Sequence, residues 1–155
     1  MIFKKFFQFI KVNILKLMRI KASPHQISLG FALGIWSNFL PIFGIHILIA
    51  ILLSYIFRSN QLSSILGSFL GSIPIIFPFF WFLSWYAGSF VLSIFINDLS
   101  KISFPIIIND FTLKVIEMII GSIILFPIII IIIYFPFIFL IIKWKKRINN
   151  KTLLK

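Results

Sequence analysis

The sequence contains no cysteine, so disulfides, thiolate nucleophiles and thiolate metal sites are excluded. It has only three acidic residues against fifteen Lys and Arg, which gives a formal net charge of +12. Charged residues make up only 12% of the 155 residues, whereas a soluble domain typically has about 25%. A chain with so few charges cannot cover a core with a polar surface. Because hydrophobic residues reach 61%, we predict a single all-α integral membrane protein.

The motifs of common enzymes are also missing. The chain has no G-x-S-x-G, H-E-x-x-H, phosphate-loop or dinucleotide-binding pattern. The acids Asp98, Asp110 and Glu117 fall together, far along the chain from His46, so a paired general acid and base inside a membrane is hard to assemble. Two distant histidines do not supply a metal site. We therefore expect a protein that is not an enzyme, with no cofactor and no metal.

Twelve of the basic residues lie near the two ends of the chain, six within 1–21 and six within 143–155. Basic clusters that flank apolar spans are typical of the cytoplasmic side of a membrane, where they also attract anionic lipid headgroups. This placement argues against nucleic acid as a partner. We expect a multi-pass protein with both termini in the cytoplasm.

Hydropathy divides the chain into five segments. Residues 1–22 predict an amphipathic interfacial helix with a Phe-rich face, although such a helix could instead only pack on the rest of the protein. Basic residues recur through it and no small-residue cleavage site follows, so a signal peptide is not expected. Residues 23–96 predict a membrane domain, 97–118 a polar extracytoplasmic loop, 119–142 a transmembrane helix and 143–155 a basic cytoplasmic tail.

Proline and glycine interrupt two apolar stretches, which predicts two broken helical hairpins. The stretch 27–57 is broken at 41–44, and the stretch 62–96 at 74–78. Each half of the first is too short for a hydrocarbon core of about 30 Å. In the favoured topology 27–57 re-enters and returns, 62–96 crosses outward, and 119–142 crosses back. In the alternative 27–57 crosses, 62–73 returns, 75–96 crosses and 119–142 returns, which demands that 62–73 span the membrane although a span needs about 20 residues.

The first break carries polar residues. His46 follows Pro41 and Gly44, and an ionisable residue at membrane depth is a functional-site hypothesis by default. Near a break it could meet freed backbone groups, water or a polar ligand. The structural alternative is a neutral imidazole bonded to a carbonyl released at Pro41. Asn38 could hydrogen-bond between helices, a common packing role in membranes.

Arg58 and Asn60 close the first hairpin. Arg58 could hold a lipid phosphate at the headgroup level, or it could be a topogenic arginine that only snorkels to the interface. The candidate substrate-binding residues are thus His46, Pro41, Gly44, Asn38, Arg58 and Asn60.

Glycines recur four residues apart in both broken stretches, as Gly30 with Gly34 and Gly67 with Gly71. Small residues at this spacing let two helices approach closely, so we predict that the two stretches pack on each other here. Paired Pro/Gly-interrupted segments also occur at the substrate sites of transporters, between their repeats.

Several of these residues form a pattern that extends from Ser23 to Gly88. It comprises Ser23-Pro24, Ile27, Gly30, Gly34, Pro41-x-x-Gly44, Arg58-x-Asn60 and Tyr86-Ala87-Gly88. The pattern resembles the bacterial integral-membrane family catalogued as domain of unknown function 2062. The resemblance implies a small inner-membrane protein with no established activity. Some members are fused to glycosyltransferase-like domains, which points to envelope or lipid-linked sugar metabolism.

Two functions are compatible with these features. In the first, the protein is a conduit or binder for a lipid-linked or small polar substrate of envelope metabolism, and the broken helices form its site. In the second, it is a non-catalytic scaffold whose breaks only permit tight packing and whose basic ends recruit envelope or lipid-synthesis enzymes. The expected partners are the bilayer with its anionic lipid headgroups and, as a possible homo-oligomer, further copies of the chain.

Overall fold

The computed structural model describes residues 22–42, 44–99 and 110–152, and every regular element in these ranges is helical. The predicted all-helical fold is therefore confirmed for this part of the chain. The amphipathic helix predicted for 1–22 lies outside the described residues except for its last position.

The helices begin and end close to the predicted breaks. Their bounds are α2 Pro24–Trp36, the 3-10 helix η1 Ser37–Phe39, α3 His46–Ile56, α4 Gln61–Gly71, α5 Phe77–Leu99 and α6 Asp110–Thr152. Ser23 caps α2 through a capping box, because its hydroxyl accepts from the Gln26 amide while the Gln26 side chain accepts from the Ser23 amide. Proline at the first helical position then fits without the loss of a hydrogen bond.

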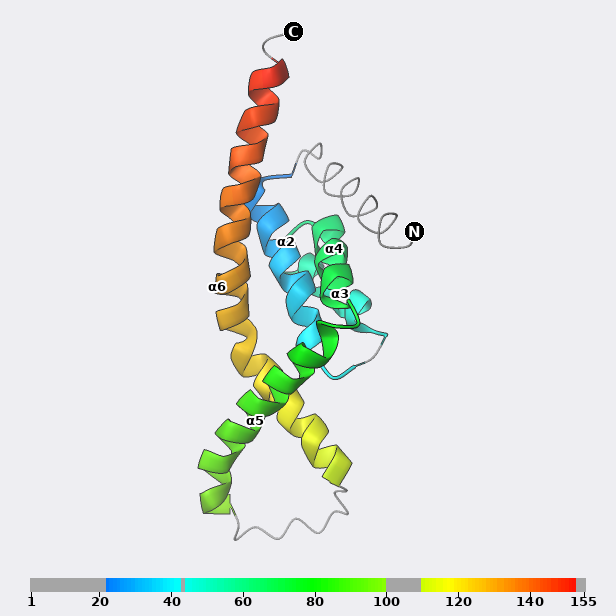
Figure 1. Cartoon of the computed structure of the whole chain (residues 1–155), viewed down its shortest axis with the longest axis vertical. Coiled ribbons are helices and arrows are strands. Elements are labelled where there is room, and N and C mark those ends of the chain that lie inside the picture. The colour runs from blue at the N-terminus through cyan, green and yellow to red at the C-terminus, as the bar shows by residue number, and fades with distance from the viewer. Residues whose placement is uncertain (1–21, 43, 100–109, 153–155) are drawn as a thin grey trace.

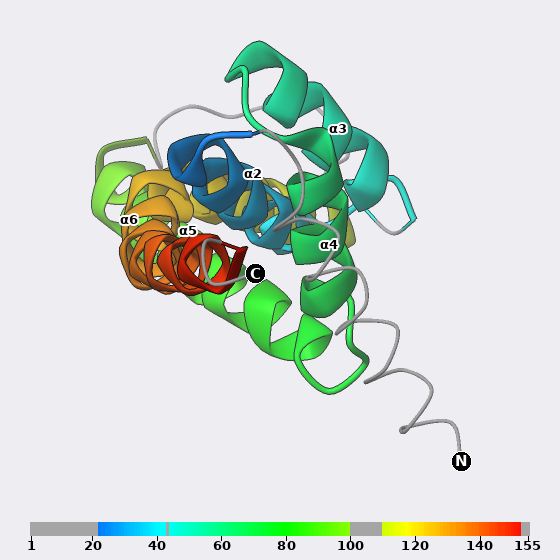
Figure 2. The same cartoon turned by 90° about the horizontal axis from the view of Figure 1, so that it is seen from above.

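Helices α2 and α4 run parallel and pack on each other, and α3, which connects them in the sequence, returns alongside both (Figure 1). Near the start of both helices the Asn60 amide donates to the Gln26 carbonyl, at 3.0 Å. Near their ends the Asn38 side chain donates to the Ser68 carbonyl, at 3.2 Å. Seen from above, α2 lies between α6 and α4, with α3 beyond (Figure 2). The chain therefore comes back after α3 to the end of the molecule at which α2 starts.

The four glycines of the two G-x-x-x-G pairs lie where α2 and η1 pack against α4 and its N-cap. A Cβ on Gly34 would overlap the Ser64 carbonyl, and one on Gly67 would overlap the Phe31 carbonyl. These neighbours are backbone atoms that cannot rotate away. The two backbones thus touch directly, in the manner of small-residue contacts between membrane helices.

Helix α6 crosses α5 near its start and then runs along α2 (Figure 1). Trp36, Phe39 and Ile129 form a buried cluster at the level of the first break, and the Trp36 indole donates to the Ser122 carbonyl at 2.8 Å. Toward the start of α6, α5 and α6 cross where Gly88 faces α6, and beyond the crossing they diverge (Figure 1).

The polar connection predicted at 97–118 is shorter in the structure. Helix α5 continues to Leu99 and α6 already starts at Asp110, and residues 100–109 between them are outside the described part. The reason is that three charged residues do not prevent a helix, and 110–118 contains no proline or glycine to end one.

Large apolar side chains cover much of the outside. Leu48 on α3 is 64% exposed, and Ile132 and Phe139 on α6 are 63% and 69% exposed. Among the described helices, two contain stretches long and apolar enough to cross a membrane, Phe77–Ile94 and Phe111–Arg147. Helices α2 and α3, with 13 and 11 residues, are only about 20 and 17 Å long.

Candidate functional site

The two helix breaks lie side by side, and three polar side chains connect them. The Ser72 hydroxyl, at the C-cap of α4, is 2.9 Å from Asn38 Oδ1 in η1 and 2.8 Å from His46 Nε2 at the start of α3. We refer to Asn38, His46 and Ser72 as the break cluster. Three separate elements thus meet at one hydrogen-bonded group, at the point where helical hydrogen bonding stops.

Asn38 is fully buried, and both the nitrogen and the oxygen of its side-chain amide form hydrogen bonds. Its Nδ2 lies 3.0 Å from the Gly34 carbonyl, 3.3 Å from the Ile35 carbonyl and 3.2 Å from the Ser68 carbonyl, while Oδ1 accepts from Ser72. Carbonyls in the last turn of a helix lack intrahelical partners, and a side-chain amide supplies two donors for them. Asn38 therefore ties the end of α2 to α4, as the sequence predicted for a bond between helices.

His46 has one satisfied ring nitrogen and one unsatisfied. Its Nε2 meets the Ser72 hydroxyl rather than a carbonyl released at Pro41. Its Nδ1 is buried and meets no hydrogen-bond partner among the described residues. A neutral imidazole carries one donor and one acceptor, so either tautomer leaves one of them unmatched here. A buried unmatched polar atom costs about 1–3 kcal/mol, which a ligand or water could recover.

Gly44 and Pro41 form the loop that leads to His46. Gly44 has a φ of +84°, a backbone conformation that glycine adopts without strain, and a Cβ there would meet no atom within 4 Å. Pro41 follows Leu40, whose carbonyl accepts from the Ile42 amide at 2.8 Å. Both residues determine the path of the chain at the break, and their side chains offer no polar atom.

Arg58 lies in the turn that ends α3. The Ser59 amide donates to the Ser54 carbonyl at 2.8 Å, and the Arg58 amide donates to the Tyr55 carbonyl at 3.2 Å. This pair of bonds is the Schellman motif, whose left-handed position is usually glycine. Arg58 holds that position with a φ of +49°. Left-handed backbone costs a residue with a Cβ about 1–2 kcal/mol.

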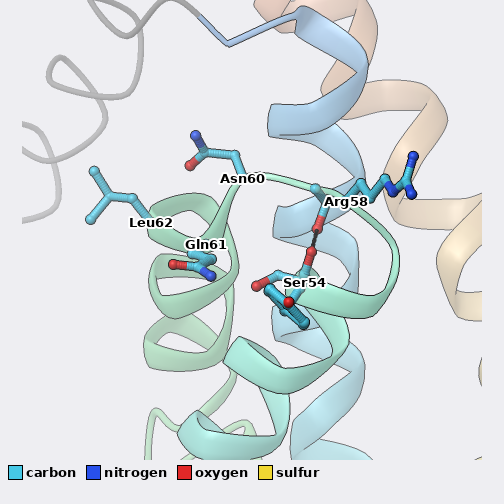
Figure 3. Close-up of a pocket in the computed structure, with 7 residues that line it drawn as sticks. Ser54, Arg58, Asn60, Gln61 and Leu62 are labelled. Atoms are coloured by element: carbon cyan, nitrogen blue, oxygen red, sulfur yellow. Dashed lines mark hydrogen bonds between the residues drawn. The ribbon is translucent and has the colours of Figure 1, made fainter.

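Asn60 caps α4 instead of acting with Arg58. Its side-chain oxygen accepts from the Ser63 amide at 2.9 Å, and the Arg58 side chain extends away from it (Figure 3). Beside the turn is an open hollow of about 520 Å³, lined in part by Arg58, Asn60 and Gln61, which we name the turn hollow. The two residues that the sequence paired thus line one hollow but do not touch.

Two further polar contacts were not anticipated from the sequence. Ser72 is an ordinary serine in an apolar stretch, and only its place at the end of α4 brings it to Asn38 and His46. Glu117 accepts from the Trp85 indole at 2.7 Å, 32 residues away along the chain. The i, i+4 spacing of Ser68 and Ser72 along the glycine-bearing side of α4 is the one signal that could have indicated the first contact.

The described residues contain no group of three or more His, Cys, Asp or Glu that could hold a metal ion. No curated protein and no solved structure matches the chain. A family model described as "Uncharacterized protein conserved in bacteria (DUF2062)" matches residues 7–149. Because this match covers nearly the whole sequence, including the break cluster and the turn hollow, the chain belongs to the bacterial DUF2062 family.

Proposed function

We propose that the protein is a multi-pass protein of the bacterial inner membrane in which α2, η1 and α3 form a re-entrant hairpin. Helices α4 and α5 then cross outward as one broken span, and α6 crosses back. The lengths of α2 and α3, about 20 and 17 Å, support this topology because a hydrocarbon core is about 30 Å thick. The return of the chain to the start of α2, at Asn60, supports it as well.

The distribution of charge supports the orientation. The basic residues 143–147 lie in α6 at the end where α2 starts, and there the Lys145 ammonium donates to the Ala22 carbonyl. The acids lie toward the opposite end, with Asp98 in the last turn of α5 and Asp110 at the start of α6 (Figure 1). The basic end then faces the cytoplasm by the positive-inside rule.

The absence of native cysteine makes this topology directly testable. Single cysteines at Ser59 and Ser103 should label differently when intact cells receive a membrane-impermeant thiol reagent. Ser103 should label from outside, whereas Ser59 should label only after the cells are permeabilised, because the re-entrant hairpin returns it to the cytoplasm. Labelling of both positions in intact cells would mean that the first stretch spans the bilayer, and the topology would be wrong.

Within this topology the break cluster binds the polar group of a lipid-linked or small polar substrate, and the protein acts as a conduit or binder in envelope metabolism. The observation that carries this proposal is the buried, unmatched Nδ1 of His46 at the junction of two helix breaks. Broken membrane helices supply substrate sites because the backbone there is not fully used by its own helix. The role is non-catalytic binding, with no cofactor.

Replacing His46 by alanine should abolish function while leaving the protein in the membrane. The measurement is complementation of a deletion strain under envelope stress, with membrane abundance determined in parallel. Truncation removes Nδ1 together with a single bond to Ser72, whereas Asn38 keeps its three carbonyl contacts. We expect activity to fall about tenfold or more with abundance within about twofold.

The second histidine provides a matched control. His25 is exposed at the start of α2 and hydrogen-bonds with the Tyr134 hydroxyl at 2.6 Å. His25→Ala removes the same chemical group outside the break cluster and should complement normally. Full complementation by His46→Ala would contradict the binding role.

A scaffold that recruits envelope or lipid-synthesis enzymes is the second candidate. One observation favours it: the Asn38 amide is already fully used in bonds within the chain, so its role is structural. A scaffold should tolerate His46→Ala and lose function only when Gly34→Leu separates α2 from α4. The two variants together therefore discriminate between the candidates.

A further inference from the structure

The turn after α3 holds an arginine where its backbone favours glycine. Both hydrogen bonds of the Schellman motif are present around Arg58, and the residue at its left-handed position normally has no Cβ. Arg58 is the one residue other than glycine with a positive φ in the described part of the chain. A locally unfavourable residue that persists points to a role for its side chain.

The Arg58 guanidinium has no counter-charge within the described part of the molecule. The residue is exposed, and its side chain makes no hydrogen bond or ion pair there. The Glu117 carboxylate accepts a hydrogen bond from the Trp85 indole near the start of α6, at the opposite end of the molecule from Arg58. The cation therefore lies at the basic end of the molecule without an acid to neutralise it, beside the turn hollow.

We propose that Arg58 and the turn hollow form a binding site for a phosphate group, supplied by the headgroup of a membrane lipid. Guanidinium presents paired donors that match the oxygens of phosphate. The hollow of about 520 Å³ is open and is lined by Ser54, Asn60 and Gln61 as well as Arg58, so it offers hydroxyl and amide groups beside the turn that carries the cation. A charged site at headgroup level meets phosphate at high local concentration.

This inference goes beyond the proposed function, because it adds a second site, for a phosphate-bearing lipid, apart from the break cluster. It rests on that proposal for the orientation of the protein in the membrane. The headgroup would lie at Arg58, at the cytoplasmic end, and not at the break cluster, which is separated from it by the length of α3. Variants at the two places should therefore have independent effects on lipid binding.

The decisive variant is Arg58→Gly, because it should move stability and binding in opposite directions. Glycine relieves the left-handed strain, so the melting temperature of the full chain in a neutral detergent should rise by about 2–8 °C. The same change removes the guanidinium, so the affinity for short-chain phosphatidic acid, measured by titration calorimetry, should fall about ten- to hundredfold. Arg58→Lys, which keeps the charge, should bind with an intermediate affinity.

Arg147→Gln is the matched control, because it removes one positive charge from the same end of the molecule within the regular helix α6. It should change the affinity less than about threefold. If Arg147→Gln and Arg58→Gly lowered the affinity equally, the binding would reflect general electrostatic attraction to the basic end, and the proposed site would be wrong. Unchanged binding by Arg58→Gly would overturn the site as well. A lower melting temperature for Arg58→Gly would also overturn it, since the arginine would then be part of the turn's own stability.

Two further sets of binding measurements identify the source of the phosphate and distinguish the site at Arg58 from the break cluster. If inorganic phosphate binds as tightly as phosphatidic acid and is lost with Arg58→Gly, the ligand is free phosphate and the lipid source is wrong. Phosphatidylcholine, whose phosphate is neutralised by its own ammonium, should bind more weakly than phosphatidic acid. His46→Ala should bind phosphatidic acid like the unaltered chain, so failure at Arg58 and failure at His46 are distinguishable.

Discussion

Replacing Gly34 by alanine is expected to lower the free energy of unfolding by about 2–3 kcal/mol, although alanine is the better helix former. The added Cβ would overlap the Ser64 carbonyl and would lie 2.8 Å from the Ser68 amide nitrogen. Both are backbone atoms of a helix, so α2 and α4 must move apart along their whole contact. The hydrogen bond from Asn38 to the Ser68 carbonyl would then lengthen as well.

The measurement is thermal unfolding in detergent followed by helical circular dichroism, where this loss corresponds to a fall of roughly 4–12 °C. Gly44→Ala is the informative comparison. Its Cβ would meet no atom within 4 Å, and only the φ of +84° opposes it, so we expect a loss of about 1 kcal/mol. The idea of direct backbone contact fails if Gly34→Ala is no worse than Gly44→Ala, or if trimming Ser64 to alanine rescues it.

The helical breaks and the fold class could be predicted because they depend on local chemistry. Proline and glycine disfavour a continuous helix in soluble and membrane proteins, and the structure has its two breaks near 41–44 and 74–78, although Pro127 and Pro136 are accommodated inside α6. The spacing of Gly30 and Gly34 predicted a close contact with another helix, because residues four apart lie on one face of a helix. Family membership, which the residue pattern indicated, is confirmed by the match over 7–149.

The partners of the polar residues could not be predicted, because they depend on the tertiary arrangement. Nothing near Ser72 in the sequence marks it as the link between Asn38 and His46. Glu117 was assigned to a polar loop, yet it lies within α6, where its carboxylate accepts from the Trp85 indole of α5. Hydropathy measures transfer from water, and it does not register a donor supplied by a distant helix.

The left-handed turn at Arg58 could not be predicted for a different reason. A Schellman motif is recognised in sequence by its glycine, and here the position is occupied by arginine. The sequence indicated the turn by its polarity but contained no signal for its backbone conformation.

Replacing Asn38 by aspartate should destabilise the protein by about 3 kcal/mol or more, in spite of the nearly identical shape of the side chain. The Asn38 amide nitrogen faces the carbonyls of Gly34, Ile35 and Ser68 at 3.0–3.3 Å. A carboxylate would set an oxygen against three others in a fully buried position. The expected result is a melting temperature at least about 6 °C lower, with loss of the protein from membranes at growth temperature.

Asn38→Ala should be milder, about 2 kcal/mol, because the same carbonyls keep other donors. The Gly34 carbonyl still accepts from the Ser37 hydroxyl at 2.7 Å, and the Ser68 carbonyl from the Ser72 amide at 3.0 Å. What alanine removes is the tether between α2 and α4 and the packing of the side chain.

Gly71 tests this interpretation, because a Cβ there would overlap the Asn38 side chain and not backbone. Gly71→Ala should therefore lower the free energy of unfolding strongly in the unaltered chain. In a chain that already carries Asn38→Ala it should lower it little further, because the shorter side chain at position 38 leaves room for the added Cβ. A double-mutant cycle should give a coupling of about 1–3 kcal/mol. Additive effects would show that Gly71 and Asn38 do not share one contact, and the structural role assigned to Asn38 would then lose its basis. Coupling, together with loss of function in His46→Ala at normal abundance, would assign two roles to neighbouring residues: Asn38 holds the breaks together, and His46 binds the ligand.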